Sequence, residues 1–474
     1  MYDCTKNYIS GEWISSDANN LHDIINPATE ESIGQVAYGT ADDVDQAVMA
    51  ARTAFEEFSM WTVEQRLELL GKIEETYLAR YNDMAGAITA EMGAPVTLSQ
   101  KAQAATGVGH LRATIAALKA MELEETVGTS TVLKEPVGVC GLITPWNWPI
   151  NQIVCKVAPA IAAGCTVVLK PSEIAPVNAT LFAEILDAAG VPAGVFNLVH
   201  GDGPGVGSAM SAHPGIDMMS FTGSTRAGIL VAKSAADTVK RVAQELGGKS
   251  ANIILEGAPL EEAIKSGVIG MFGNTGQSCN APSRMLVPDS MYDHAVAVAA
   301  AVAEHVQPGD PQDPKTRMGP VVSETQYNKI QGLIEKGIEE GAGLVCGGLG
   351  KPEGMETGYF VKPTIFRDVN NDMTIAREEI FGPVLVMIPY STIDEAVEIA
   401  NDTDYGLSGY VYGGSTEEAM AVARRMRTGM VHLNGAANDI SAPFGGYKQS
   451  GNGREWGAHG IEDFLELKSV MAAM

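Results

Sequence analysis

Short apolar runs alternate with amphipathic stretches between residues 137 and 257, and this alternation constrains the fold more than any other feature. The runs are VGVCGLIT, TVVLKP, VFNLVHG, MMSFTG and ANIILEG, and the stretches between them, such as APVNATLFAEILDAAG, space their apolar residues as helices do. Strands that alternate with helices pair in parallel through crossovers, and strands that are apolar throughout need cover on both faces. The sequence therefore predicts a doubly wound α/β unit.

A second α/β unit is predicted from about residue 258 to about 450. Its amphipathic stretches indicate helices near 290–305, 324–340, 393–401 and 416–427. Another helix is expected over 41–58, outside the first sheet, with Thr40 and Asp43 at its start. A chain of 474 residues is too long for one core, so we expect two or more units that pack closely without a flexible linker.

Charge and cysteine pattern exclude some classes of function. A formal charge of −26 disfavours binding to nucleic acid or to an anionic membrane surface. Residues 1–16 contain no apolar signal segment, and no run of about 18 apolar residues occurs. The six cysteines form no C-x-x-C pair, and few have a histidine nearby at a zinc spacing. We therefore expect a cytoplasmic protein without a disulfide framework or a metal site.

Cys279 differs from the other cysteines in its surroundings. It lies in FGNTGQSCN, among glycines, amides and hydroxyls, whereas Cys140 and Cys165 lie in apolar runs typical of core thiols. A thiol in a polar, glycine-rich segment stays accessible, and it becomes a nucleophile when it is ionised. Cys279 therefore does not fit the interpretation as a core thiol.

Glycine-rich turns after predicted strands are candidates for nucleotide binding, because ligands of open α/β sheets bind at the carboxyl ends of the strands. The turns are GDGPGVG (201–207) and FTGSTRAG (221–228), and the conventional pattern G-x-G-x-x-G is absent. In the second turn, Gly223 and Ser224 would precede a helix whose amides could face a pyrophosphate. A purely structural turn explains this pattern equally well.

Three further segments place polar groups at or near predicted strand ends. In LKPSE, Lys170 and Glu173 follow a strand that Pro171 stops; a carboxylate there can bind ribose hydroxyls and would repel the 2′-phosphate of NADP, although an exposed ion pair is the simpler reading. In PWNWP, Asn147 offers an amide donor for an oxyanion, although such loops more often serve packing. In QELGGKS, Glu245 could act as a general base or could cap a helix. Only the combination of segments decides between these readings.

Together the segments resemble the aldehyde dehydrogenase superfamily. PWNWP, KPSE, FTGSTRAG, ELGGKS, GQSC, EEIFGPV (378–384) and PFGGYKQSG (443–451) occur in the order and approximate spacing of that family. Glu245 precedes Cys279 by 34 residues, as is usual in the hydrolytic branches, and the resemblance runs from INPATEE (25–31) to the C-terminal strand. It implies a Rossmann-like cofactor domain, an α/β catalytic domain and a small β oligomerisation arm. The implied boundaries are 1–117 and 137–246 for the NAD-binding domain, 247–448 for the catalytic domain, and 118–136 and 449–474 for the arm.

The resemblance also implies a mechanism. Cys279 would attack the aldehyde, Asn147 and the Cys279 amide would hold the oxyanion, and Glu245 would activate the water that hydrolyses a thioester. NAD is the implied cofactor, and NADP is less favoured. The residues implied to bind the cofactor are Ile143, Thr144, Pro145, Trp146, Lys170, Glu173, Gly203, Phe221, Gly223, Ser224, Leu246, Glu379 and Phe381.

The substrate is expected to be a small-molecule aldehyde, whose identity the sequence leaves open. No arginine lies at 148–155 or beside Cys279 to hold a second carboxylate. The segment GNTGQSCNAPSR is nevertheless similar to a bacterial branch that oxidises ω-oxo and semialdehyde acids, including 6-oxolauric acid. The implied substrate pocket consists of Trp148, Gln152, Cys155, Ser278, Asn280, Asn438 and Phe444.

Two other classes of protein are less favoured by these residues, and an oligomer is expected. A CoA-acylating relative would use the same cysteine but generally lacks a carboxylate at the position of Glu245, and a non-catalytic structural member would have lost some of the chemical residues. Residues 118–136 resemble the family's protruding hairpin, and DFLELKSVMAAM has matching strand character at the C-terminus. Because exposed strand edges need a partner, we expect a homodimer or homotetramer.

Overall fold

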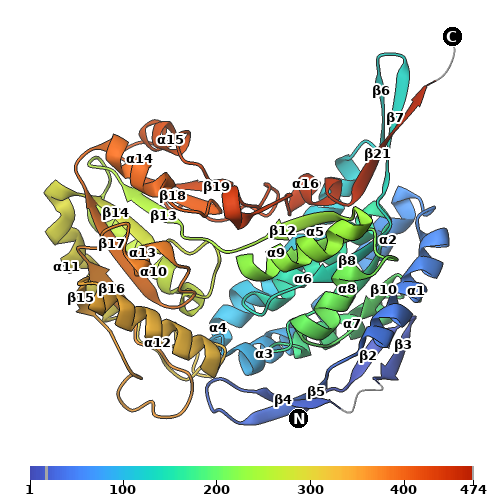
Figure 1. Ribbon diagram of the computed structural model, residues 1–474, viewed down its shortest axis with the longest axis horizontal. Helices are drawn as coiled ribbons and strands as arrows, with labels where there is room; N and C mark the ends of the chain where they lie inside the picture. Colours follow the sequence, from blue (N-terminus) through green and yellow to red (C-terminus); the bar gives the residue numbers. More distant parts are fainter. Residues whose placement is uncertain (17–19, 472–474) are drawn as a thin grey trace.

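An eight-stranded sheet forms the larger half of the computed structural model, which describes residues 1–16 and 20–471 (Figure 1). Its strand order is β20-β12-β11-β8-β9-β10-β2-β3, and the five strands from β12 to β10 run parallel. The strands are β2 (Lys6–Ile9), β3 (Glu12–Ser15), β8 (Val139–Ile143), β9 (Thr166–Lys170), β10 (Phe196–Leu198), β11 (Met218–Thr222), β12 (Arg241–Glu245) and β20 (Gly451–Asn452).

Alternate side chains of the central strands face two different apolar cores. Cys140 and Leu142 of β8 belong to one core and Val139 and Ile143 to the other, as the two-residue period of a strand requires. The first core contains residues of α2 (Val63–Ala79), α3 (Tyr81–Met92), α5 (Ala104–Ala120), α6 (Pro149–Ala163) and α7 (Val177–Ala188). The second contains residues of α1 (Ala41–Phe58), α8 (Ser208–Ala212) and α9 (Thr225–Ala235). The predicted doubly wound unit is therefore confirmed.

Helix α1 begins where the sequence predicted. The Thr40 hydroxyl accepts a hydrogen bond from the Asp43 amide at 3.3 Å, and the Asp43 carboxylate accepts one from the Thr40 amide at 2.7 Å. This reciprocal cap satisfies two amides that a helix start leaves free.

The order of the parallel strands reverses beside β8. The chain passes from β8 to β9 and β10 on one side, and then returns to place β11 and β12 on the other side. The carboxyl ends of β8 and β11 lie next to each other at this switch point, where open α/β sheets leave a crevice.

A seven-stranded sheet forms the other half of the molecule, at the left of Figure 1. Its order is β15-β16-β17-β14-β13-β18-β19, and only the edge strand β15 is antiparallel. The strands are β13 (Ala251–Ile254), β14 (Arg284–Pro288), β15 (Gly343–Cys346), β16 (Thr364–Arg367), β17 (Val384–Tyr390), β18 (Ser408–Tyr412) and β19 (Met430–Leu433). Its helices are α10 (Leu260–Phe272), α11 (Tyr292–Ala303), α12 (Glu324–Glu339), α13 (Thr374–Arg377), α14 (Ile393–Asn401) and α15 (Thr416–Ala423).

The run ANIILEG lies in a different sheet from the one that the alternation alone indicated, although it falls within residues 247–448, where the family resemblance put the second domain. The alternation from 137 to 257 put this run in the first unit, but β13 pairs with β14 and β18 in the second sheet. Residues 246–250 carry the chain directly from the end of β12 to the start of β13 without an intervening helix. An apolar strand looks the same in sequence whichever sheet it joins, so the pattern could not reveal this crossing.

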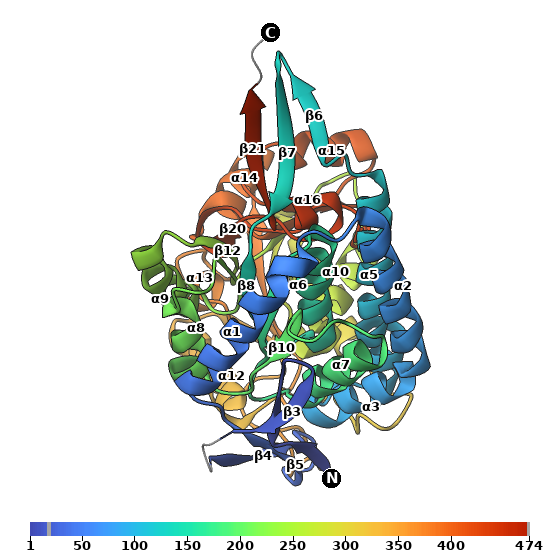
Figure 2. The ribbon, with the colours of Figure 1, turned by 90° about the vertical axis from the view of Figure 1, so that its right-hand side faces the viewer.

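A three-stranded arm projects from the body (Figures 1 and 2). The hairpin β6 (Glu124–Val127) and β7 (Ser130–Pro136) is joined by β21 (Leu465–Met471), which runs antiparallel to β7. The two segments with unpaired edges in the sequence thus pair with each other within one chain. The outer edges of β6 and β21 carry no strand among residues 1–16 and 20–471.

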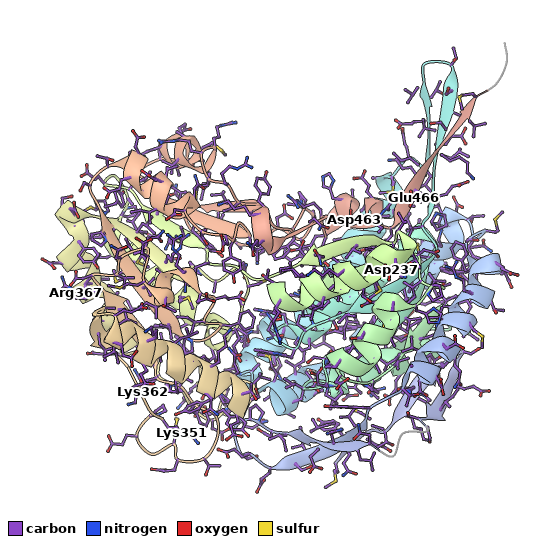
Figure 3. The ribbon with its side chains drawn as sticks, in the orientation of Figure 1. Asp237, Lys351, Lys362, Arg367, Asp463 and Glu466 are labelled. Carbon is purple, nitrogen blue, oxygen red and sulfur yellow. The ribbon has the colours of Figure 1, made fainter. Side chains whose placement is uncertain are left out.

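The base of the arm is held by Arg241, the first residue of β12. Its guanidinium donates to the carbonyl oxygens of Asp463 and Leu465, both at 2.8 Å, and pairs with the Glu466 carboxylate at 2.9 Å. Figure 3 labels Asp463 and Glu466 at this junction.

Only part of the predicted segment 449–474 belongs to the arm. β20 pairs with β12, and α16 (Gly457–Glu462) packs on α5 and α6 in the first unit. Residues 472–474 lie outside the described residues. The predicted division into a cofactor domain, a catalytic domain and an arm stays a prediction.

A small fourth sheet runs along the bottom of Figure 1 near the N-terminus. Its order is β1-β5-β4, with β1 (Tyr2–Cys4), β4 (Leu21–Ile25) and β5 (Ser32–Ala37). None of the helices formed by the described residues is long and apolar enough to cross a membrane.

Candidate active site

The segment 246–250 connects the two sheets. Two glycines in it, Gly247 and Gly248, let groups of the second unit lie directly against this segment. A Cβ atom at position 248 would overlap the carbonyl oxygen of Cys279, and one at position 247 would stand 2.5 Å from the Glu379 carboxylate. The Gly248 amide donates to Glu379 Oε1 at 2.8 Å. Glycine at both positions therefore lets Glu245, at the end of β12, lie near Cys279 and Glu379 of the second unit.

A strained turn positions the nucleophile. Asn274, Thr275 and Gly276 have φ angles of 51°, 57° and 70°, three successive residues in the left-handed region. Such a conformation costs free energy for residues other than glycine and persists only where the surroundings hold it. Thr275 donates through its hydroxyl to the Gly319 carbonyl at 3.1 Å, and the Gln277 side chain accepts from the Val322 amide at 2.9 Å.

A buried amide network ties this turn to the PWNWP loop. The Asn274 Nδ2 group donates to the carbonyl oxygens of Asn147 (2.9 Å) and Gln277 (3.1 Å), and Gln103 donates to Asn147 O and to Asn274 Oδ1. The Asn147 side chain uses one N–H to bond the Gln277 carbonyl at 3.1 Å. Its second amide N–H has no acceptor among residues 1–16 and 20–471, and Asn147 lines the same cavity as Cys279.

Cys279 is half-buried and its thiol is not ionised by its surroundings. Burial, and then the carboxylates of Glu379 and Glu245, raise the pKa of the Cys279 thiol, while the amides of Asn280 and Cys279 oppose this shift. Cys140 and Cys165 are fully buried, as predicted for core thiols. The candidate nucleophile is thus a neutral thiol when no ligand is bound.

Glu245 is buried, and neither carboxylate oxygen has a hydrogen-bond partner in the described part of the chain. Burial and the neighbouring Glu455 raise the pKa of Glu245 well above its usual range, whereas Lys156 and Arg454 oppose the shift. Lys156 is paired with Glu455 and also donates to Ser220 at 3.1 Å. A carboxyl with a raised pKa can take up a proton near neutral pH, which suits a general base.

A cavity of about 190 Å³ opens beside Cys279 at the switch point of the first sheet. Trp146 and Phe381 form an edge-to-face pair across it, with ring centres 5.4 Å apart. Gln326 holds residue 381 in place by donating to its carbonyl oxygen at 2.8 Å. Of the residues predicted to bind the cofactor, those that line this cavity are Pro145, Trp146, Gly223, Ser224, Leu246, Glu379 and Phe381.

The other predicted cofactor residues lie outside this cavity. Lys170 donates to the Pro171 carbonyl at 3.0 Å and to Glu173 at 3.1 Å, so the predicted pair forms. Gly207 lies close to the side chains of Ile143 and Lys170. The remaining three lie in or after parallel strands of the first sheet: Phe221 in β11, Thr144 directly after β8 and Gly203 after β10.

Sequence reasoning missed several residues of the site. Thr222, Gly247, Gln326 and Lys329 also line the cofactor-side cavity. The first two are neighbours of residues that were predicted, but Gln326 and Lys329 lie on α12, whose amphipathic pattern gives no functional signal. Lys156, Glu455 and Gln103 likewise carry no sequence motif.

A second cavity, of about 280 Å³, lies beyond the residues that flank Cys279. Trp148, Ser278, Asn280 and Asn438 of the predicted substrate pocket line it, and the Trp148 indole donates to the Ser278 hydroxyl at 2.8 Å. The other three predicted residues are buried away from it. Gln152 lies on α6, and Cys155 and Phe444 pack in an apolar cluster that Cys279 also contacts.

Comparison with known proteins extends this picture. The model of the aldehyde dehydrogenase family matches residues 13–470, which is almost the whole chain. The chain belongs to the aldehyde dehydrogenase family. The family, the α/β fold class and the enzyme class predicted from the sequence are confirmed.

Individual relatives of this aldehyde dehydrogenase are similar over their full length. A 3-succinoylsemialdehyde-pyridine dehydrogenase of a Pseudomonas species is 58% identical over 472 residues, 99% of each chain. The crystal structure of a mutant aldehyde dehydrogenase C from Pseudomonas syringae with NAD+ and octanal is 51% identical, with a TM-score of 0.98 over 99% of this chain and 96% of that one. An aldehyde dehydrogenase from Bartonella henselae is 49% identical, with a TM-score of 0.98 over 99% of both chains.

The protonation of Cys279 leads to a test on the protein without cofactor. Because the pKa of this thiol is raised, the thiolate fraction is small at pH 7 and grows tenfold with each pH unit below that pKa. Alkylation of Cys279 by iodoacetamide, followed by peptide mass spectrometry, should therefore accelerate about a hundredfold from pH 7 to pH 9. Cys279→Ala gives the background from the other thiols. A rate that is already level at pH 7 would contradict the assignment.

Proposed function

We propose that this protein oxidises an aldehyde to the carboxylic acid with NAD as the hydride acceptor. The observation that carries the proposal is the position of residues 278–280, which contribute Cys279 to one cavity and Ser278 and Asn280 to the other. A cofactor in the first cavity would contact the sulfur directly, and an aldehyde held in the second cavity would approach it past Ser278 and Asn280, the residues on either side. The NAD+ and octanal bound in the Pseudomonas syringae structure support this reading.

The cofactor-side cavity fits a nicotinamide nucleotide. It lies at the switch point, is walled by the Trp146 and Phe381 rings, and is lined by Thr222, whose buried hydroxyl has no partner within the described residues. Ser224 caps α9 by accepting from the Ala227 amide, which leaves other N-terminal amides of that helix free to bond a pyrophosphate. Glu379 would bind the ribose next to the nicotinamide, and Lys170 and Glu173 the adenosine ribose. When bound, NAD supplies the hydride-accepting chemistry that the chain lacks.

The first half of the reaction uses Cys279 and Asn147. The Cys279 thiol first releases its proton to solvent, and the resulting thiolate forms a bond to the aldehyde carbon, so that the carbonyl oxygen gains the negative charge. The second N–H of the Asn147 amide and the Cys279 amide donate hydrogen bonds to that oxygen. Gln103 and Asn274 hold the Asn147 backbone carbonyl, and the Gln277 carbonyl holds its side-chain amide, so the Asn147 donor is oriented before the substrate arrives.

The second half uses Glu245. After oxidation the acyl group is held on Cys279 as a thioester, and Glu245 takes a proton from the water that attacks it. The carbon–sulfur bond then breaks, which releases the acid and restores Cys279. A buried carboxylate without hydrogen-bond partners can accept such a proton, and it argues for water rather than coenzyme A as the acyl acceptor.

The molecules named for the relatives agree on an aldehyde group but not on the rest of the molecule. The Pseudomonas relative is named for a semialdehyde that carries a pyridine, and the Pseudomonas syringae structure holds an unbranched octanal. These two molecules share little beyond the aldehyde. We further propose that the eight-stranded unit binds the cofactor and that the seven-stranded unit supplies the nucleophile.

The roles of Glu245 and Cys279 can be separated by rapid-mixing kinetics. Glu245→Gln should keep a pre-steady-state burst of NADH, while steady turnover falls by roughly 10²–10⁴-fold, because only hydrolysis needs the base. Cys279→Ala should lose both the burst and turnover and still bind NAD. If Glu245→Gln loses the burst as well, Glu245 acts in the first half-reaction or in folding.

Cofactor choice tests Glu173. Its carboxylate would repel a 2′-phosphate, and a difference of about 1.4 kcal/mol corresponds to tenfold in affinity. The wild type should therefore prefer NAD, and Glu173→Gln should raise kcat/KM for NADP about tenfold while Lys170 stays in place. Glu75→Gln, an exposed acid on α2, is the matched control. Equal kcat/KM values for NAD and NADP in the wild type would show that Glu173 does not contact this part of the cofactor.

We also propose that the chain forms a homodimer or homotetramer through the arm. β21 presents Leu467 and Met471, which are 71% and 77% exposed, along an unpaired strand edge. Light scattering at micromolar concentration should give about two or four times the chain mass of 49.9 kDa. Leu467→Lys should lower this mass, and Leu78→Lys, at an exposed site on α2, should not. A wild-type mass near that of one chain would refute the oligomer.

A further inference from the structure

The second cavity is polar but uncharged. Its walls include the aromatic side chains of Trp148, Tyr410 and Tyr412 together with amides and small residues, and no Asp, Glu, Lys, Arg or His of the described chain lines it. Its volume of about 280 Å³ equals the share of roughly nine water molecules at about 30 Å³ each. It could therefore hold a substrate tail of about ten non-hydrogen atoms.

Most polar groups in these walls are already satisfied. The Tyr412 hydroxyl donates to Ser266, the Tyr410 hydroxyl donates to the Asn280 carbonyl at 2.7 Å, and Trp148 donates to Ser278. None of these donors needs a ligand.

Three side-chain amides in these walls, those of Asn280, Asn438 and Asn252, have no hydrogen-bond partner among the described residues, and of the three only Asn252 is buried. This residue lies on β13 and is 1% exposed, yet neither Oδ1 nor Nδ2 has a hydrogen-bond partner within the described residues. Gly267 of α10 leaves room for it, because a Cβ atom there would stand 2.5 Å from Nδ2. A buried amide with no partner is costly, and native proteins rarely keep one without a ligand or an ordered water. Asn252 lines the cavity, so the missing partner can enter from it.

We infer that the physiological aldehyde has an uncharged tail with a hydrogen-bonding group, such as an amide, a ketone or a ring nitrogen, that bonds Asn252. This inference rests on the proposed oxidation at Cys279 and specifies its substrate. A carboxylate at the end of the tail is disfavoured, because the walls offer no cation and a buried unpaired charge is expensive. The inference therefore departs from the ω-oxo acids that the sequence resemblance suggested.

Three matched aldehydes test the inference through kcat/KM. Each has a six-carbon chain with the aldehyde at one end and, at the other, a primary amide, a methyl group or a carboxylate. The wild type should prefer the amide over the other two by about tenfold or more, since a site built to bond a polar group rejects analogues that lack it. Asn252→Leu should lose about tenfold on the amide and stay within about threefold on the methyl-ended aldehyde, which controls for folding and for the reaction at Cys279.

A binding measurement separates this inference from the proposed function. Hexanamide has no aldehyde, so its binding to the protein without cofactor, measured by calorimetry, does not depend on oxidation. Binding should be weakened about tenfold by Asn252→Leu and also by Gly267→Ala, which displaces the amide without removing it. If none of the aldehydes yields NADH but hexanamide binding depends on Asn252, the proposed oxidation fails and the tail site stands.

Other outcomes would overturn the inference. A preference for the carboxylate-ended aldehyde would show that the tail is charged. An equal loss on all three aldehydes in Asn252→Leu would give Asn252 a structural role only. An amide preference and hexanamide affinity that Asn252→Leu leaves unchanged would mean that an ordered water, rather than the substrate, satisfies Asn252.

Discussion

The close approach of the Cys279 backbone to Gly248 and of the Glu379 carboxylate to Gly247 is the constraint on which the site depends. The chain leaves the first sheet at Glu245 and enters the second at Ala251, with no helix between them. Because neither glycine has a side chain, the Cys279 backbone and the Glu379 carboxylate can lie directly against this segment. The candidate base Glu245 therefore lies near the candidate nucleophile Cys279 and the carboxylate of Glu379, across the boundary between the two units. Each unit alone would hold only part of the chemistry.

Burial away from water determines how readily Cys279 and Glu245 lose their protons. The same burial raises the pKa values of the Cys279 thiol and the Glu245 carboxyl, so both hold their protons more tightly than they would in water. The buried Lys156–Glu455 pair acts on Glu245 in both directions, because Glu455 raises its pKa and Lys156 lowers it. Hydrogen-bond donors, in contrast, are fixed in advance through the network of Gln103, Asn147 and Asn274. The positions of these donors are thus set before a ligand binds. The ionisation of the Cys279 thiol, with which the reaction starts, is not.

Much of the fold and part of the site could be predicted from local pattern. The Thr40 cap, the helices of the second unit and the buried strands follow from periodicity and capping, which depend on neighbours in sequence. Cys279, Asn147 and Glu245 could be selected because their polar, glycine-rich or proline-bound settings are unusual for such residues. Gln326, Lys329, Lys156 and Glu455 could not, because each lies in an ordinary local context and gains its role from a contact more than 40 residues away.

The sequence by itself determined which groups could react: a thiol in a polar segment, a carboxylate before two glycines and an amide between two prolines. Only the tertiary structure decided how they act together. It moved the strand ANIILEG into the second sheet, held Asn274 and Thr275 in left-handed conformations, and left the Asn252 amide unpaired at a cavity without charged walls. The physical reason is that burial, pKa and hydrogen-bond satisfaction depend on groups brought together from distant parts of the chain, and local pattern carries no record of them.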